Sequence, residues 1–260
     1  MLHQAPWRKE VAAAAGVDWI SALPDDILVL ILLRLDTIAE AARTSVLSRR
    51  WRRVWALLPV LLFPDGRHIR EVLAASEAPA LRLIFITTND DTAESVAAWL
   101  PLAARRLSGD LTYNNRRQLE RYEEEEGAVD QEQAVPLPCF ESATTIDLDL
   151  GFLPLALPSS GEFARLAQLH LKRVRFHGRL KLGNVVSSPR CPVLRLLSVV
   201  DSFGLDTLTV HSKSLLKMEL RPLNGFREIT IDAQALKELI LFNCFGRNQP
   251  VANIAAPELV

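Results

Sequence analysis

The stretch Leu194–Leu241, "LRLLSVVDSFGLDTLTVHSKSLLKMELRPLNGFREITIDAQALKELIL", decides the fold of this chain of 260 residues. Within it, an apolar-x-x-apolar-x-apolar pattern begins three times at intervals of 21 residues, at Leu194, Leu215 and Leu236. Two further copies begin about midway between these, at Leu205 and Phe226. The spacing predicts a solenoid in which each turn holds a strand on one side and a second extended segment on the other. Little room remains for a long helix in these turns.

The same pattern continues toward the N-terminus. Leu166, Leu169 and Leu171 fit it, and "TTIDLDL" at 144–150 predicts a related strand. The longer step that follows leaves room for a loop, "HGRLKLGNVVSSPRCP" at 177–192. Repeats of roughly 20 to 29 residues are typical of leucine-rich repeats, which need stacked neighbours and a cap at each end. "APELV" at 256–260 reads as the opening of one more repeat, so we expect the C-terminal end of the solenoid to be incomplete.

Ahead of these repeats, strand and helix signals alternate. "ALRLIFITTN" at 80–89 predicts a strand, "DTAESVAAWLPLAARRL" at 91–107 a capped helix, and "LTYNN" at 111–115 the next extended piece. The segment at about 114–136, with Glu123–Glu126 at its centre, lacks any apolar period. We expect a solvated, disordered acidic insertion there, and a specific acidic partner site is the sharper alternative.

The N-terminal segment begins with a strongly apolar helix signal. Pro24 suits a first helical position, and the two aspartates after it lie beside the positive end of the helix. One apolar stripe follows at helical spacing, formed by Leu28, Ile31, Leu32 and Leu35. Further apolar residues lie between them, namely Val29, Leu30 and Leu33. This helix is apolar nearly all round and must be covered on more than one side.

Two further helices are predicted directly after it. Thr37-Ile38-Ala39-Glu40 matches a capping box and starts a helix that runs to about Ser45. Ser48 suits the N-cap of a third helix that ends near Pro59. On this third helix one stripe is formed by Trp51, Val54, Trp55 and Leu58, and the arginines of "SVLSRRWRRVW" (45–55) occupy the remaining circumference. Single-stranded nucleic acid needs aromatic and basic groups in the same groove, so the stripe predicts an attachment surface for protein.

Composition excludes several other classes of function. Lys plus Arg number 30 and Asp plus Glu 31, so no overall field attracts a nucleic acid, and we expect no nucleic-acid partner. The longest apolar run, Ile27–Leu33, is far shorter than the roughly 18 to 20 residues of a membrane span. We therefore expect no membrane partner. Residues 1–17 read as a loose, disordered tail.

Reactive side chains are scattered. Cys139, Cys191 and Cys244 are odd in number, widely spaced and free of any CxxC pattern, which predicts idle thiols and a reducing, intracellular compartment, the nucleus or the cytoplasm. No metal site and no cofactor are expected. The five histidines form no HExxH pair, and no nucleophile elbow or glycine-rich phosphate loop is present. We therefore expect no catalytic residues.

A resemblance enters with "LPDDILVLILLRL" (23–35) followed by "TSVLSRRWRRVW" (44–55), which together closely resemble the F-box. With the repeats behind it, the chain resembles the plant F-box/leucine-rich-repeat proteins, many of which continue into an FBD domain. The expected fold is α/β: a disordered tail at 1–17, a small three-helix F-box at 18–63, and a leucine-rich-repeat solenoid with parallel strands at 64–260.

This resemblance implies a substrate-recognition subunit of an SCF-type E3 ubiquitin ligase, without a catalytic site of its own. The F-box would bind a Skp-family adaptor and, through it, a cullin, while the solenoid binds an unknown protein substrate. The implied adaptor contacts are Leu23, Pro24, Ile27, Leu28, Ile31, Leu35, Val46, Leu47, Trp51 and Trp55. The apolar pairs at 29–30 and 32–33 would pack on the following repeat.

Substrate candidates are the residues between the apolar positions of the strands and their immediate flanks. They are Gln168, His170, Lys172, Lys217, Glu219, Arg221, Lys237 and Glu238. The alternative function is a non-catalytic leucine-rich-repeat interaction protein, or a truncated F-box protein, that is not coupled to ubiquitination.

Overall fold

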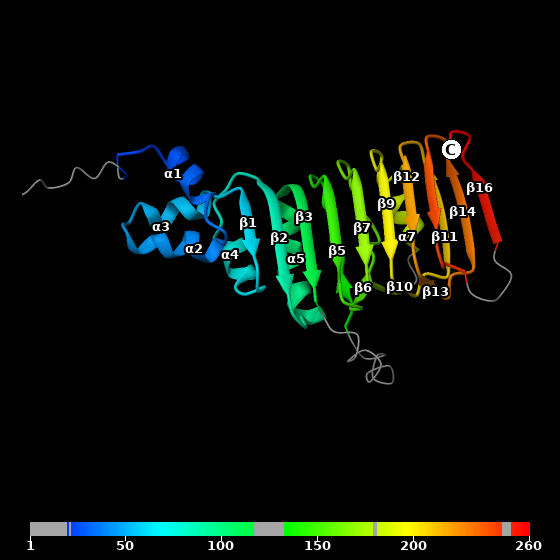
Figure 1. Cartoon of the computed structure of the whole chain (residues 1–260), viewed down its shortest axis with the longest axis horizontal. Helices are drawn as coiled ribbons and strands as arrows, with labels where there is room; N and C mark the ends of the chain where they lie inside the picture. The colour runs from blue at the N-terminus through cyan, green and yellow to red at the C-terminus, as the bar shows by residue number, and fades with distance from the viewer. Residues whose placement is uncertain (1–19, 21, 117–132, 179–180, 246–250) are drawn as a thin grey trace, which may run out of the picture.

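The computed structural model describes residues 20, 22–116, 133–178, 181–245 and 251–260. Short helices lie at one end, and the strands follow one another along the molecule in chain order (Figure 1). The largest sheet contains eight strands in the order β1-β2-β3-β5-β7-β9-β12-β15. All strand pairings of the described residues are parallel, as expected for an α/β solenoid.

The strands fall into three sheets. The eight-stranded sheet is built from β1 (Val60–Phe63), β2 (Leu81–Thr88), β3 (Leu107–Asn115), β5 (Thr145–Asp149), β7 (Gln168–Lys172), β9 (Leu196–Val200), β12 (Lys217–Leu220) and β15 (Glu238–Leu241). The five-stranded sheet contains β4 (Val135–Pro136), β6 (Pro154–Ala156), β8 (Arg175–His177), β10 (Ser202–Phe203) and β13 (Leu223–Asn224). The three-stranded sheet contains β11 (Thr207–Ser212), β14 (Glu228–Ala233) and β16 (Val251–Ala255).

The 21-residue spacing is visible in the register of the strands. Lys217 in β12 pairs with Leu196 in β9 and with Glu238 in β15, so equivalent residues of successive turns lie side by side. The midway copies of the pattern form β11 and β14 of the three-stranded sheet. The predicted turn, with one strand on each side, is confirmed.

Side-chain alternation explains why these segments are strands. In β7 the inner residues Leu169 and Leu171 are buried, whereas the outer ones face away from the core. In β12 the buried partners are Met218 and Leu220. The outward-pointing residues of the eight-stranded sheet therefore form one face, here called the outward face.

Three helices begin the described chain: α1 (Asp25–Leu32), α2 (Ile38–Arg43) and α3 (Trp51–Val54), with 3₁₀ turns η1 (Thr44–Val46) after α2 and η2 (Trp55–Leu57) after α3. Two predicted boundaries are wrong. Pro24 is the N-cap of α1 and not its first residue. The third helix is shorter than predicted: Arg50 precedes it, and no side chain caps it, so Ser48 is not its N-cap.

The capping box of α2 is confirmed in part. The Thr37 hydroxyl accepts a hydrogen bond from the Glu40 N–H at 3.2 Å. The Glu40 carboxylate accepts from the N–H of Asp36, at 3.1 Å, one residue earlier than the sequence predicts. Thr92 caps the predicted later helix, α5 (Ala93–Arg106), by accepting from the Ser95 N–H.

β1, at the end of the range 18–63 predicted for the F-box, pairs with β2 and belongs to the eight-stranded sheet. One other expectation needs correction. The loop predicted at 177–192 contains a short helix, α7 (Leu182–Val186), whose Leu182, Val185 and Val186 are buried. A further short helix, α4 (Ile69–Ala75), lies between β1 and β2.

Both ends of the predicted acidic insertion are structured. Asn114 and Asn115 belong to β3, and Asn115 is fully buried with hydrogen bonds to Asp91 and Leu150. Val135–Pro136 forms β4. The predicted disorder at 117–132 and in the tail at 1–17 lies outside the described residues.

The segment "APELV" lies outside the strands but continues the backbone hydrogen bonding of earlier turns. The Val260 N–H donates to the Lys237 carbonyl at 3.1 Å, just as the Lys237 N–H donates to Leu216 and the Leu216 N–H to Arg195. Its predicted place at the opening of another repeat is thus consistent with the backbone pairing.

One continuous hydrophobic core extends from Leu28 in α1 to Cys244 after β15. Cys191 and Cys244 are buried in it as free thiols, and Cys139 is also unpaired. Burial raises the pKa of the Cys191 thiol to about 12, which leaves almost no reactive thiolate. None of the described helices has the length and apolar character needed to cross a membrane.

Candidate functional site

The outer surface of α1 and η1 is unusually apolar. Val46 and Leu47 in and after η1 are 83% and 65% exposed, and Leu30 in α1 is 57% exposed. Three further predicted contact residues of this region are also exposed: Ile27, Ile31 and Leu35. We call these six residues the apolar docking surface. Large apolar side chains left in water on a well-packed unit mark interaction sites.

Two residues predicted as partner contacts lie inside the protein. Leu28 is fully buried and Trp51 is 6% exposed, and both pack in the hydrophobic core. Their side chains therefore hold the helices together and offer no surface to a partner. Leu23 and Trp55 are half-buried, Pro24 is exposed, and these three stay predictions together with the exposed residues.

Leu30 was expected to pack on the following repeat and instead points into solvent. Its neighbour Val29 and also Leu33 are half-buried against the core. Sequence reasoning assigned Leu28 to the partner and Leu30 to the protein interior, the reverse of their burial, because every position of this helix but the first two is apolar.

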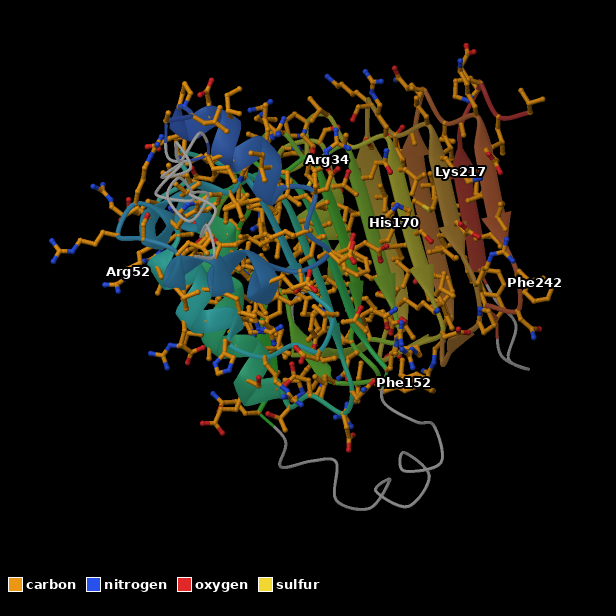
Figure 2. All side chains as sticks on the ribbon, turned by 60° about the vertical axis from the view of Figure 1, so that its left-hand side comes forward. Arg34, Arg52, Phe152, His170, Lys217 and Phe242 are labelled. Carbon is orange, nitrogen blue, oxygen red and sulfur yellow. The ribbon has the colours of Figure 1, made fainter. Side chains whose placement is uncertain are left out.

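Arg50 links the start of α1 to the segment before α3, a contact that sequence reasoning missed. Its guanidinium donates to the Asp25 carboxylate through Nε at 2.7 Å and also to the Leu23 carbonyl. The other arginines of this segment are exposed; Arg53 pairs with Glu77 at 3.6 Å, and Arg52 lies at the outer side of the helices (Figure 2). The predicted separation of tryptophans from arginines is confirmed.

The outward face of the eight-stranded sheet is the second candidate surface. His170 and Lys217, labelled in Figure 2, lie on β7 and β12 of this sheet. Six predicted substrate contacts share the face: Gln168, His170, Lys172, Lys217, Glu219 and Glu238. Arg221 follows β12 and pairs with Glu219, while Lys237 precedes β15 and lies outside the strand. No contact with a substrate tests these eight predictions.

Most charges of this face are paired. The Lys217 ammonium contacts Glu238 at 2.7 Å. The buried Asp149 carboxylate contacts Arg173 at 2.7 Å and Lys172 at 3.5 Å. These pairs fix side chains that point the same way from neighbouring strands.

Asp147, in the middle of β5, differs from these paired groups. Burial raises the pKa of its carboxyl, Asp149 raises it further, and His170 and Lys172 oppose the shift. His170 lies directly opposite it in β7. Sequence reasoning named neither Asp147 nor the outward residues of β1 and β2; of these strands, only β1 was predicted to lie outside the solenoid.

Asp147, His170 and Ser198 follow one another on β5, β7 and β9 in the order of a catalytic triad. No hydrogen bond joins these described side chains to one another; the Ser198 hydroxyl donates to Glu219 at 3.5 Å. A triad requires its members to be within hydrogen-bond reach. Among the described residues, no group of three or more His, Cys, Asp or Glu could hold a metal ion.

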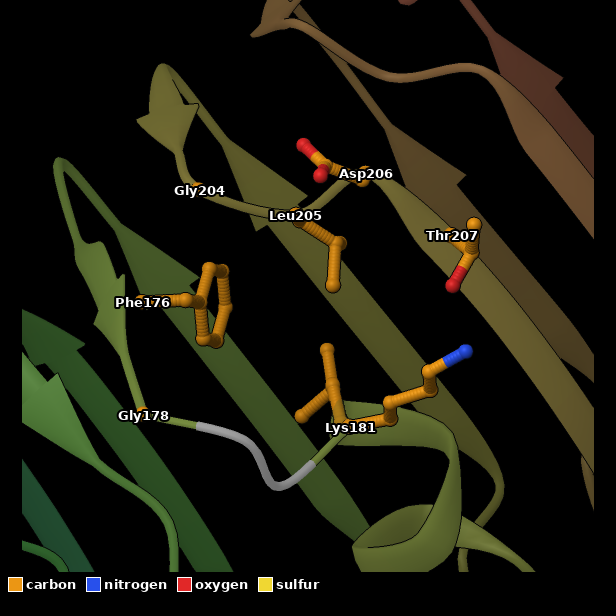
Figure 3. A pocket seen from close by; sticks show the side chains of 8 residues that line it. Phe176, Gly178, Lys181, Gly204, Leu205, Asp206 and Thr207 are labelled. Atoms are coloured by element: carbon orange, nitrogen blue, oxygen red, sulfur yellow. The ribbon is translucent and has the colours of Figure 1, made fainter.

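The opposite side of the solenoid carries a small cavity of about 250 Å³ (Figure 3). The side chains of Phe176 and Leu205 line it, together with those of Lys181 and Asp206. Gly204 has a φ of +74°, and a Cβ there would meet the Phe176 carbonyl at 2.5 Å. The glycine thus lets two successive turns approach closely, and the cavity lies beside this contact.

Comparison with known proteins finds matches over both regions of the chain. Residues 20–63 match the F-box domain, which includes the whole apolar docking surface. Residues 96–260 match the LRR repeats of the family described as FBD-associated F-box protein At5g56370. No solved structure was found to match the chain.

Similar proteins come from Arabidopsis thaliana. The putative F-box/LRR-repeat protein At4g15060 is 30% identical over 88% of this chain and 56% of its own length. The F-box/FBD/LRR-repeat protein At5g22700 is 30% identical over 92% of this chain and 57% of its own length. F-box protein At1g80960 is 55% identical over a shorter stretch, 21% of this chain. The chain spans about half the length of the curated relatives that it matches over most of its residues. With an F-box, parallel repeats and these relatives, the chain belongs to the F-box proteins with FBD-associated leucine-rich repeats.

Proposed function

We propose that the chain is a substrate-recognition subunit of an SCF-type E3 ubiquitin ligase. The apolar docking surface binds a Skp-family adaptor and, through it, a cullin, and the outward face of the eight-stranded sheet holds the target protein. The observation that carries this proposal is the apolar docking surface itself, which lies inside the F-box match. Assembly with this ligase places the protein in the nucleus or the cytoplasm.

The energetics support a bound partner on this surface. Burying one Leu or Val side chain is worth roughly 1.5 to 3 kcal/mol, and association and ordering costs offset part of that gain. Several such side chains lie on α1 and η1 in solvent, whereas the core beneath them is fully packed. A protein partner that covers them removes this apolar area from water.

The proposal is tested by co-purification of the full chain with a Skp-family adaptor and a cullin. The double variant Ile31→Asp/Leu47→Asp places charges on the docking surface, and we expect it to capture at least tenfold less adaptor than wild type. Val193→Asp is the matched control, because Val193 is a similarly exposed apolar residue (42%) on the solenoid. It should capture as much adaptor as wild type.

Equal capture by the docking-surface variant and by wild type would contradict the assignment of these residues. Leu23→Ala/Pro24→Ala tests the start of α1 in the same assay. A chain that captures no adaptor at all would support the alternative, a repeat protein that binds partners without reaching a ligase.

A further inference from the structure

The outward face changes character along one row of residues near its N-terminal edge. Leu62 in β1 lies opposite Phe85 in β2, which lies opposite Thr112 in β3, which lies opposite Asp147 in β5. Phe85 is 40% exposed, although it is a phenylalanine in the middle of a strand. The row thus runs from apolar to polar to acidic over four neighbouring strands.

Among the described residues, the carboxylate at the acidic end has no direct ion pair, although His170 and Lys172 lie near enough to lower its pKa. In the described part of the chain, the Asp147 carboxylate makes no hydrogen bond and no ion pair, whereas the neighbouring Asp149 is held by Arg173 and Lys172. Asp110 in β3 is exposed and accepts one hydrogen bond, from the Thr144 hydroxyl at 2.7 Å. Farther along the sheet the carboxylates are paired, Glu219 with Arg221 and Glu238 with Lys217. The carboxylates of this face that lack a direct ion pair among the described residues therefore lie on β3 and β5.

We propose that this corner of the face binds an extended segment of the target protein that carries an apolar side chain and, three positions away, a lysine or arginine. The apolar side chain packs on Phe85 and Leu62, and the cation pairs with Asp147, with Asp110 adjacent. This inference rests on the proposed function, since it assumes that the outward face holds the target. Charge complementarity identifies the occupant as a basic protein segment, because the same carboxylates repel the phosphates of a nucleic acid.

The spacing follows from the geometry of sheets. Neighbouring strands lie about 4.8 Å apart, so Phe85 and Asp147, two strands apart, are separated by roughly 10 Å across the sheet. A polyproline II segment advances about 3.1 Å per residue with three residues per turn, so positions three apart point the same way about 9 Å apart. Such a segment, lying across the strands, places the two side chains over the two sites.

Burial gives the cation a physical advantage at this position. A half-buried carboxylate without a direct ion pair has lost part of its hydration, and burial raises the pKa of Asp147 more than His170 and Lys172 lower it. A bound guanidinium or ammonium restores the favourable electrostatic environment of the charged form. Direct contact between charges in such a partly dehydrated site is stronger than on an open surface.

Selection from a random library tests the motif without assuming a target. Displayed random peptides of 12 residues are selected on the full chain, in complex with adaptor where it binds. We expect enrichment of Lys or Arg three positions from Leu, Ile or Phe. Enrichment of acidic residues, or of no charged residue, would overturn the inference.

Variants then locate the site. With a fluorescently labelled selected peptide, Asp147→Asn should weaken binding roughly three- to tenfold, as expected for loss of one partly buried charge pair, and should flatten the salt dependence. Phe85→Ala should weaken binding similarly. Glu228→Gln is the matched control, since Glu228 is an exposed carboxylate on β14 of the three-stranded sheet, and it should bind as wild type does. Equal affinity of wild type and Asp147→Asn refutes the site.

Adaptor capture by the same preparations separates the two proposals. Asp147→Asn should capture as much adaptor as wild type. Peptide binding that depends on Asp147 in a chain that captures no adaptor would uphold this inference and overturn the proposed function. Adaptor capture by a chain that selects no such peptide motif would support the proposed function and overturn this inference.

Discussion

The strongest prediction separates two leucines that the sequence treats alike. Leu28 is fully buried in α1, whereas Leu47 after η1 is 65% exposed, although both match adaptor contacts of the F-box. For Leu28→Ala, loss of the whole buried side chain and the cavity left behind should cost about 3 to 4 kcal/mol of the free energy of unfolding. For Leu47→Ala, only about a third of the side-chain surface is covered, so the cost should stay below about 1 kcal/mol.

Binding should show the opposite order. If the adaptor buries Leu47, its truncation removes roughly 1.5 to 3 kcal/mol of apolar contact, which corresponds to about a 10- to 100-fold weaker Kd. Leu28→Ala, in the fraction that stays folded, should keep most of its affinity.

Urea unfolding followed by circular dichroism gives the stabilities, and calorimetric titration of the purified chain with a Skp-family adaptor gives the affinities. The reasoning is refuted if Leu47→Ala destabilises the chain as much as Leu28→Ala. It is refuted equally if Leu47→Ala leaves the adaptor affinity unchanged.

Three further outcomes are expected. Arg50→Ala should lower the free energy of unfolding by about 1 kcal/mol, because its charge-assisted hydrogen bonds are lost. Arg53→Ala breaks a longer, exposed ion pair and should change the free energy of unfolding by less than about 0.5 kcal/mol in the same urea titration. At a pH above the raised folded-state pKa of Asp147, Asp147→Asn should increase the free energy of unfolding, because folding then no longer buries a charge. This increase should vanish as the pH falls below the unfolded-state pKa of 3.8. An increase that does not change with pH would show that burial of the charge is not its cause. A fragment of residues 12–64 should lack a cooperative thermal transition, since β1 loses its partner β2 and the helices lose the shared core; a sharp, concentration-independent transition of the monomeric fragment would show the opposite.

The sequence predicted the solenoid because every turn must point apolar side chains into the same core, and this requirement repeats the same pattern at every turn. Residues such as Leu197, Met218 and Leu239 must point into one core, so their spacing repeats along the chain and needs no knowledge of distant contacts. The same is true of the Thr37 and Thr92 caps, whose partners lie three residues away.

What could not be predicted depends on contacts between distant segments. Strand β1 is only four residues long, and its apolar run also fits the end of a helix, so its pairing with β2 gives no sequence signal. Arg50 reaches Asp25 across 25 residues, and it stands among three other arginines that a sequence cannot rank.

The apolar docking surface could likewise be predicted only in part. In α1 almost every residue is apolar, so composition indicates that the helix needs cover on several sides but not which sides the protein itself covers. Asp147 is unremarkable as an outward position in a strand. Its importance depends on the register that gives Asp149 to Arg173 and leaves Asp147 beside a histidine.

The pairing of β1 with β2 has a mechanical consequence. Because the first strand after α3 is hydrogen-bonded into the large sheet, the helical end and the repeats are joined without an intervening flexible linker. The Ala56 carbonyl in η2 also accepts from the N–H groups of Glu77 and Ala78, which tightens the same junction. A protein attached to α1 and a protein attached to the outward face are thereby held at a fixed mutual angle. An insertion of a few glycines between Leu58 and Val60, ahead of β1, would loosen that angle while leaving both attachment surfaces chemically intact.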